Sequence, residues 1–254
     1  MNNEQRAVKI AVNIGTLLMR NGAEVYRVEE SIRRILSSYG YENPDVFAIP
    51  NHLVVSVENE SGEAVTRTKR IYVRSVNFEK VVALNDLSRR LSMKPLPFDD
   101  VDREIERIQN KMGYSSIISF LSSGLVALFF TLMFGGNWLD GIIACFAVLM
   151  GRVVCSQMER FHANSFFVTM TASFIHSTVA YLFAFNLLSL HLNHIIVGTL
   201  MVLVPGVAFM TAVRDIIARD LIAGIMEMME AIVIAVAIAI GSAASLALLP
   251  LLWR

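Results

Sequence analysis

Apolar residues recur at intervals of three and four along the first part of the chain, a spacing typical of helices with one buried face. One such pattern covers residues 7–18, and a second covers residues 25–36. The pair Asn21-Gly22 separates them, and Asn21 is the predicted N-cap of the second helix because Glu24 follows three residues later. The pattern predicts a hairpin of two amphipathic helices.

The segment 46–75 has a different pattern, in which apolar and polar positions alternate. Leu53, Val55 and Val57 would share one face of a strand, and the pair at 61–62 marks a turn into a second strand. We therefore predict a β-hairpin or a small sheet in this part of the chain.

Two further helical patterns follow the strands, at 78–91 and 97–112. Residues 1–116 thus combine helices and strands, and a segment of this length can bury a hydrophobic core of its own. The prediction for this part is an α+β domain.

Long apolar runs fill the rest of the chain, residues 117–254, and five of them are long enough to cross a bilayer. Their expected bounds are about 117–134, 138–154, 166–190, 195–213 and 225–252. The expected fold class is therefore an α+β N-terminal domain followed by an all-α membrane domain of five transmembrane helices.

Charge follows the same division, since 33 of the 44 charged residues, 17 basic and 16 acidic, lie in 1–116. The net charge of zero gives no reason to expect a nucleic acid as partner. Glu4, Arg6 and Lys9 interrupt the N-terminal hydrophobic residues and no cleavage pattern follows, so we do not predict a signal peptide. We expect the N-terminal domain to be cytoplasmic.

The loops of the membrane part predict the same orientation. The connections at 135–141 and 191–194 contain no Lys or Arg, whereas basic residues follow the second and fourth spans. Because Lys and Arg are retained on the cytoplasmic side, this distribution predicts a multi-pass protein of the cytoplasmic (inner) cell membrane with its N-terminus inside. Arg254, at the other end of the chain, is the one basic residue against this prediction.

The fourth apolar segment contains Pro205-Gly206 near its middle. Proline lacks a backbone donor and clashes with the preceding turn, so we expect the helix to kink or break there. Broken helices at membrane depth often supply polar backbone atoms to a transported substrate. A structural kink with no ligand is the alternative.

Ionisable residues near or within the apolar segments are the other candidates for a substrate pathway, because charges in hydrocarbon are costly unless they are paired or hydrated. The alternatives are a cytoplasmic loop with an interfacial helix turn for the charged residues, and packing for the histidine. The candidates are Arg214, Asp215, Arg219, Asp220, Glu227, Glu230 and His176.

Small residues recur every four positions in the last span, which predicts close packing against another helix of this chain or of a partner. They are Ala231, Ala235, Ala239, Ala243 and Ala247.

No motif for catalysis or for a cofactor is present, because the sequence lacks a nucleophile elbow, a zinc-binding histidine pair and a phosphate loop. We therefore expect neither an enzyme nor a bound metal or cofactor. Cys145 and Cys155 are expected to be core residues.

Two segments resemble a known family. The sequence LVPGVAFMTAVRDIIARDLIAGI resembles the membrane signature of the bacterial threonine/serine exporter family, and NGAEVYRVEESI resembles that family's N-terminal signature. The likeness covers nearly the full chain. The N-terminal residues that carry it are Gly22, Ala23, Glu24, Val28 and Glu29, and we include Asn51 with them as a candidate of the N-terminal domain.

Members of this family consist of one long chain with ten spans, or of two chains, the longer of which has the soluble domain and about five spans. This chain resembles the longer subunit of the two-chain form, to which the bacterial two-subunit succinate exporter is related. The resemblance implies export of small polar metabolites, either threonine and serine or a dicarboxylate such as succinate. It also implies a shorter integral-membrane partner, since five spans alone require a partner or a homo-oligomer to enclose a pathway.

The leading hypothesis is a secondary transporter subunit that works by alternating access around the broken fourth helix. Arg214 would attract a substrate carboxylate, and Asp215 or Asp220 would pair with Arg214 or with an ammonium group. The N-terminal domain would gate access or bind the partner. The alternative is a membrane-anchored regulatory or scaffold protein whose N-terminal domain binds a soluble partner.

Overall fold

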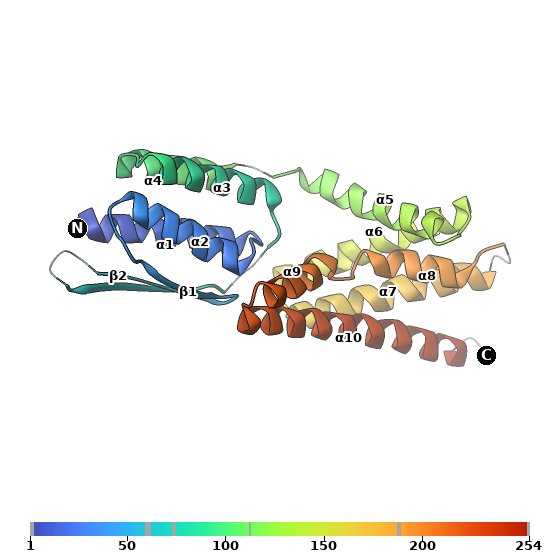
Figure 1. The fold of residues 1–254 in the computed structure, drawn as a ribbon. Helices are drawn as coiled ribbons and strands as arrows, with labels where there is room; N and C mark the ends of the chain where they lie inside the picture. Colours follow the sequence, from blue (N-terminus) through green and yellow to red (C-terminus); the bar gives the residue numbers. More distant parts are fainter. Residues whose placement is uncertain (1–2, 59–61, 73–74, 112, 187–188, 253–254) are drawn as a thin grey trace. The chain divides into compact units, whose positions relative to one another are not determined.

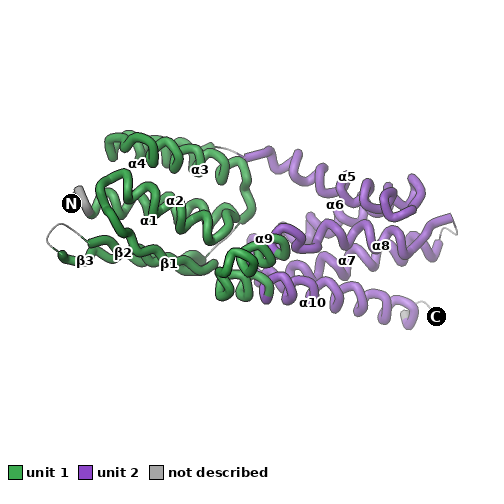
Figure 2. Tube along the Cα trace, in the orientation of Figure 1, with its two compact units in different colours: residues 1–112, 209–228 green, residues 113–208, 229–254 purple. Residues whose placement is uncertain are grey.

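The computed structural model describes residues 3–58, 62–72, 75–111, 113–186 and 189–252. These residues form two compact units (Figure 2). Unit 1 contains residues 1–112 and 209–228, and unit 2 contains residues 113–208 and 229–254.

Unit 1 contains a three-stranded antiparallel sheet in the order β1-β2-β3, covered on one face by helices. Figure 1 shows the sheet, then α1 and α2, then α3 and α4 as successive layers. The bounds are α1 (Asn3–Arg20), α2 (Val25–Ser38), β1 (Asp45–Ile49), β2 (His52–Glu58), β3 (Ala64–Arg70), α3 (Phe78–Met93) and α4 (Phe98–Asn110).

The core of unit 1 contains the apolar positions that the strand and helix patterns of the sequence predict to be buried. Leu53, Val55 and Val57 of β2 are buried and the residues between them are not, as the alternation predicts. The face of α2 that carries Val28, Ile32 and the other periodic residues is also fully buried. The two helical patterns and the small sheet are therefore confirmed.

The predicted N-cap at Asn21 is wrong. Helix α2 begins at Val25 with Glu24 as its N-cap residue, and Asn21 instead belongs to the end of α1, where its side-chain amide donates to the Leu17 carbonyl at 2.7 Å. Gly22, with φ of 89°, then lets the Ala23 amide donate back to Leu18 at 3.0 Å. This left-handed closure at the end of α1 uses the residues that would otherwise cap α2.

The described residues of the C-terminal half are mostly helical, and among them four helices are long and apolar enough to cross a membrane. The pair α8 and α9 provides a fifth span if its two halves count as one, with a bend of 56° between them. The chain is thus a multi-pass membrane protein with four or five candidate spans. The bounds are α5 (Ser116–Met133), α6 (Trp138–Arg160), α7 (Ser165–Asn186), α8 (Leu192–Met201), α9 (Gly206–Ile217) and α10 (Leu221–Leu252).

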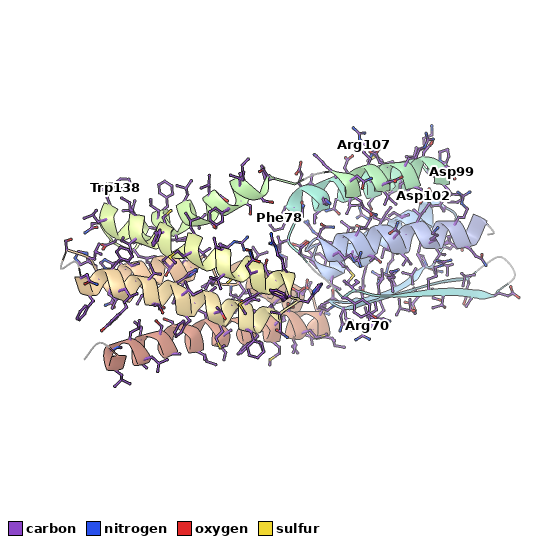
Figure 3. All side chains as sticks on the ribbon, turned by 180° about the vertical axis from the view of Figure 1, so that it is seen from behind. Arg70, Phe78, Asp99, Asp102, Arg107 and Trp138 are labelled. Atoms are coloured by element: carbon purple, nitrogen blue, oxygen red, sulfur yellow. The ribbon has the colours of Figure 1, made fainter. Side chains whose placement is uncertain are left out.

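The surfaces of the two units differ in chemistry. Helix α4 of unit 1 exposes charged side chains such as Asp99, Asp102 and Arg107 (Figure 3). In unit 2, by contrast, large apolar side chains such as Phe129 and Trp138 are 60% and 67% exposed. An apolar surface of this kind indicates lipid as the solvent of unit 2.

Within unit 2, α10 packs against α7 through a polar and close contact. The Ser173 hydroxyl donates to the Ile238 carbonyl at 2.7 Å, and Ser177 donates to Ser242 at 2.8 Å. A methyl group on Gly241 would lie 2.1 Å from the Met170 carbonyl oxygen, so only glycine allows this approach. Four of the five alanines of the predicted stripe, at 235, 239, 243 and 247, are exposed instead.

We expect Gly241→Ala to lower the thermal unfolding midpoint of the full chain in detergent, because the new methyl group must separate α7 from α10. Overpacking of this kind costs about 1–3 kcal/mol. Ala239→Val on the exposed face of the same helix is the matched control and should leave the midpoint nearly unchanged. Equal midpoints for both variants would contradict the close packing at Gly241.

Candidate functional site

The N-terminal motif and the membrane motif, which are far apart in the sequence, are in contact inside unit 1. Arg214, near the end of α9, forms an ion pair with the carboxylate of Glu24, which lies 190 residues earlier in the chain. The same carboxylate also pairs with Arg27 at 3.2 Å. The Glu24 side chain is only 13% exposed, whereas that of Arg214 is 55% exposed. A largely buried carboxylate is thus held between two arginines.

Local structure explains why Glu24 lies at this position. The turn at Gly22 ends α1 and starts α2 with Glu24 as the residue before its first turn. A negative charge is favoured there because the helix dipole is positive at this end. Ala23, the other small residue of the motif, is buried in the core of the unit at 6% exposure. The motif therefore fixes a carboxylate at the end of α2.

A second carboxylate, Glu29, lies further along the same helix. It accepts a hydrogen bond from the Ala48 amide at 2.8 Å and pairs with Arg33 at 2.8 Å. Burial raises the pKa of the Glu29 carboxyl above its usual value, and the negative charge of Asp220 raises it further. Two charged residues of the membrane motif therefore interact with the N-terminal motif. Asp220 raises the pKa of Glu29, and Arg214 pairs with Glu24.

The connection between α9 and α10 is a tight helical hairpin. Arg219 has φ of 73°, and the Asp220 amide donates back to the Asp215 carbonyl at 2.9 Å. Gly224 allows the two helices to approach, since a methyl group there would lie 2.8 Å from the Ala212 carbonyl oxygen. The repeated Arg-Asp pair of the sequence thus occupies the end of one helix and the turn after it.

The buried carboxylates lie in this hairpin. Asp215 is 0% exposed and Glu227 is 4% exposed, whereas Glu230 is exposed. These two acidic side chains are therefore shielded from solvent, whereas the other charged side chains of the hairpin are not.

The remaining predicted residues lie elsewhere. Pro205 lies in the break between α8 and α9 and Gly206 is the first residue of α9, so the predicted interruption of the helix is confirmed. Asn51 is exposed in the turn between β1 and β2, and its carbonyl accepts from the Ile71 amide at 2.9 Å. His176 of α7 is buried in unit 2, where it occupies the space that a side chain at Gly151 would need.

The contact between the N-terminal motif and the membrane motif was not predicted from the sequence. The available signal was the opposite charge of Glu24 and Arg214 within two segments that resemble signatures of one family. A second site was not predicted at all. Its residues, Asp140, His191 and His194, lie close enough together to hold a metal ion. The spacing His191-x-x-His194 was the signal for it.

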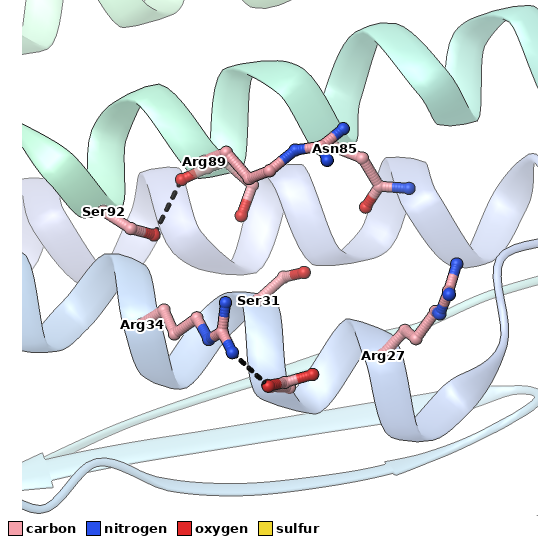
Figure 4. Close-up of a pocket in the computed structure, with 8 residues that line it drawn as sticks. Arg27, Ser31, Arg34, Asn85, Arg89 and Ser92 are labelled. Carbon is pink, nitrogen blue, oxygen red and sulfur yellow. Dashed lines mark hydrogen bonds and ion pairs between the residues drawn. The ribbon is translucent and has the colours of Figure 1, made fainter.

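A polar pocket of about 240 Å³ lies between α2 and α3 of unit 1. Figure 4 shows Arg27, Arg34 and Arg89 around it, together with the ion pair of Arg34 with Glu30. Three arginines and one glutamate give the lining a positive balance, which favours a small anion over a cation.

Comparison with known proteins identifies the family of this chain. A profile of the threonine/serine exporter family matches residues 9–249. The chain belongs to this family. Among curated proteins it is similar to the "Probable succinate transporter subunit YjjP" of Klebsiella aerogenes, with 24% identity over 94% of this chain and 93% of that protein.

Two further relatives differ in how much of their own length the match covers. The protein of the same name from Escherichia coli K12 is 21% identical over 94% of this chain and 93% of its own length. Pheromone-regulated membrane protein 10 of Eremothecium gossypii is 25% identical over 97% of this chain, but this match covers only 35% of that protein. No solved structure matches the chain. Membership of this family makes the chain a membrane exporter of small metabolites.

Proposed function

We infer that this chain is the larger subunit of a secondary transporter that exports small carboxylate-bearing metabolites, threonine- or serine-like amino acids or a dicarboxylate such as succinate. The ion pair between Arg214 and Glu24 is the observation that carries the proposal, because it joins the N-terminal domain to the end of the broken span. Relatives named as subunits of a succinate transporter support a carboxylate substrate and a second subunit.

Arg214 is the substrate-binding cation of the proposed mechanism. A guanidinium binds carboxylates strongly, and half of the Arg214 side chain remains exposed while it contacts Glu24. A substrate carboxylate would therefore compete with Glu24 for the same group. Exchange of Arg214 between the two would couple substrate binding to the position of the N-terminal domain.

The break at Pro205-Gly206 gives the end of the span freedom to move. Its 56° bend divides the span into α8 and α9, and a hinge needs only a few residues that absorb the change in direction. In alternating access, α9 would move with the N-terminal domain while the break absorbs the motion. His176, Asp215 and Glu227 would line the pathway or stabilise its closed form.

The length of α10 is consistent with an N-terminal domain outside the bilayer. Its 32 residues make a helix about 48 Å long, whereas the hydrocarbon core is about 30 Å thick. The first turns of α10, which include Glu227, would then extend beyond the hydrocarbon. The loops at 135–141 and 191–194 contain no Lys or Arg. Both observations support a protein of the cell membrane whose N-terminal domain lies on the cytoplasmic side.

The exposed alanines of α10 are the surface that we assign to the shorter membrane partner. Small side chains let two helices approach closely in lipid, and those at 235, 239, 243 and 247 are exposed in this chain. A second copy of the chain is the other occupant that such a face could accept.

Reconstitution tests the function directly. Proteoliposomes that contain the chain with its membrane partner should release loaded succinate or threonine, whereas those that contain the chain alone should not. A scaffold protein would give no efflux in either preparation, although its N-terminal domain would still bind a soluble partner. Absence of efflux from correctly inserted complex, over a panel of amino acids and dicarboxylates, would therefore contradict the proposal.

A further inference from the structure

Unit 2 holds a cluster of metal-ligand side chains that the transport hypothesis does not use. The cluster consists of Asp140, in the first turn of α6, and of His191 and His194, at the start of α8. One ligand atom from each residue lies within 4.8 Å of the other two. All three residues belong to the same compact unit.

Asp140 is held rigidly at the centre of the cluster. It completes a capping box with Asn137, in which each side chain accepts from the backbone amide of the other at 2.8 Å. Its other carboxylate oxygen accepts from the His191 amide, also at 2.8 Å. The carboxylate is 0% exposed, so its position is fixed by the fold rather than by a flexible side chain.

The rings of both histidines lie near this carboxylate, at the N-terminal end of α8. His191 Nδ1 lies 3.0 Å from Asp140 Oδ2, and the ring centroids of His191 and His194 are 5.4 Å apart. The His191 side chain is 59% exposed, so its ring can turn without displacing the core. Two imidazoles and a carboxylate therefore converge where α6 and α8 begin.

A buried nitrogen of this cluster lacks a hydrogen bond. His194 Nδ1 is inaccessible to solvent, and no residue in the described part of the chain forms a hydrogen bond with it. A buried polar atom without a partner costs free energy, whereas coordination to a metal would satisfy it. The backbone of Gly136 packs closely beside His194, since a methyl group at Gly136 would lie 3.2 Å from the His194 Cβ.

We propose that Asp140, His191 and His194 form a binding site for a divalent transition-metal ion, with Zn²⁺ as the best fit. Imidazole and carboxylate ligands suit Zn²⁺ and its neighbours, whereas Mg²⁺ and Ca²⁺ prefer all-oxygen sites. Ligands of a tetrahedral zinc site lie about 3.3 Å apart, and the ligand atoms of these three residues lie within 4.8 Å of one another. Water would complete the coordination.

Metal binding would replace a hydrogen bond by two coordinate bonds. The neutral imidazole of His191 would carry its proton on Nε2, so that Nδ1 could bind the ion while Asp140 binds it through Oδ2. The bound ion would then link the first turn of α6 to the first turn of α8. This link restrains α8, the first half of the broken span, against its neighbour.

Metal titration of the full chain, purified in detergent without a polyhistidine tag, tests the proposal. Zn²⁺ should bind with one equivalent and raise the thermal unfolding midpoint, Co²⁺ should develop the visible absorption of a tetrahedral site, and Mg²⁺ should do neither. Because these are binding measurements, their failure would leave the proposed transport function untouched.

Variants separate a metal site from a helix cap. His194→Ala removes one ligand but leaves the capping box of Asn137 and Asp140 intact, and it should weaken Zn²⁺ binding more than about tenfold. His162→Asn is the matched control, because it removes an exposed histidine elsewhere in unit 2 at a left-handed position that asparagine tolerates. Unchanged binding in His194→Ala, loss of binding in His162→Asn, or equal effects of Zn²⁺ and Mg²⁺ would overturn the proposal.

Discussion

Replacing Arg214 by glutamine should lower substrate efflux by about 10- to 100-fold, because a hydrogen bond to a charged group contributes about 1.5–3 kcal/mol. The thermal unfolding midpoint should change little. The ion pair with Glu24 is half exposed on the arginine side, and such pairs contribute only about 0–1 kcal/mol to stability. Efflux from proteoliposomes at matched insertion is the measurement, and Arg27→Gln, which removes the other arginine of Glu24, is the matched control.

A charge exchange distinguishes the two roles of Arg214. The double variant Glu24→Arg with Arg214→Glu restores an ion pair between the N-terminal domain and α9, but it cannot attract a substrate carboxylate from position 214. If Arg214 binds the substrate, efflux stays low in the double variant. Recovery of efflux would assign the pair a purely mechanical role, and normal efflux in Arg214→Gln would remove it from the mechanism.

Replacing Pro205 by alanine should lower efflux by more than about tenfold while the protein still inserts. Alanine is favoured over proline inside a helix by about 3 kcal/mol, so the substitution drives α8 and α9 towards one continuous helix. The 56° break, which the proposed mechanism uses as its hinge, would then be lost or stiffened. Efflux at matched membrane insertion is again the measurement.

Two controls separate the hinge from general effects of substitution. Pro250→Ala removes an exposed proline near the end of α10, away from any break, and should leave efflux unchanged. Gly206→Ala adds a methyl group where no atom lies within 4 Å, so it tests the glycine without a steric clash. Full efflux in Pro205→Ala would mean that the break is only a structural kink.

Much of the fold could be predicted from local pattern. The alternation at Leu53, Val55 and Val57 placed the buried face of β2, and the proline at 205 located the break between α8 and α9. These features depend on residues close in sequence, because side-chain period and proline geometry act over one or two turns. The predicted alanine stripe of α10 was less successful as a guide to packing inside the chain, since Gly241 and the serines beside it make that contact.

The candidate site could be predicted only as separate pieces. Glu24 and Glu29 belonged to one motif and Arg214 and Asp220 to another, and both were identified as candidates from sequence. The residues around each motif in the sequence do not indicate that Glu24 pairs with Arg214 or that the charge of Asp220 raises the pKa of Glu29. The same holds for Asp140, whose histidine partners lie about fifty residues later in the chain.

The sequence by itself determined the division into a charged N-terminal part and an apolar helical part, the family, and the position of the broken helix. Hydrophobic periodicity and proline geometry act along the chain and are therefore readable from it. Only the tertiary structure decided which carboxylate meets which arginine and which histidines surround Asp140. Such contacts depend on how turns and helix packing bring distant segments together, and side-chain charge alone does not specify a partner.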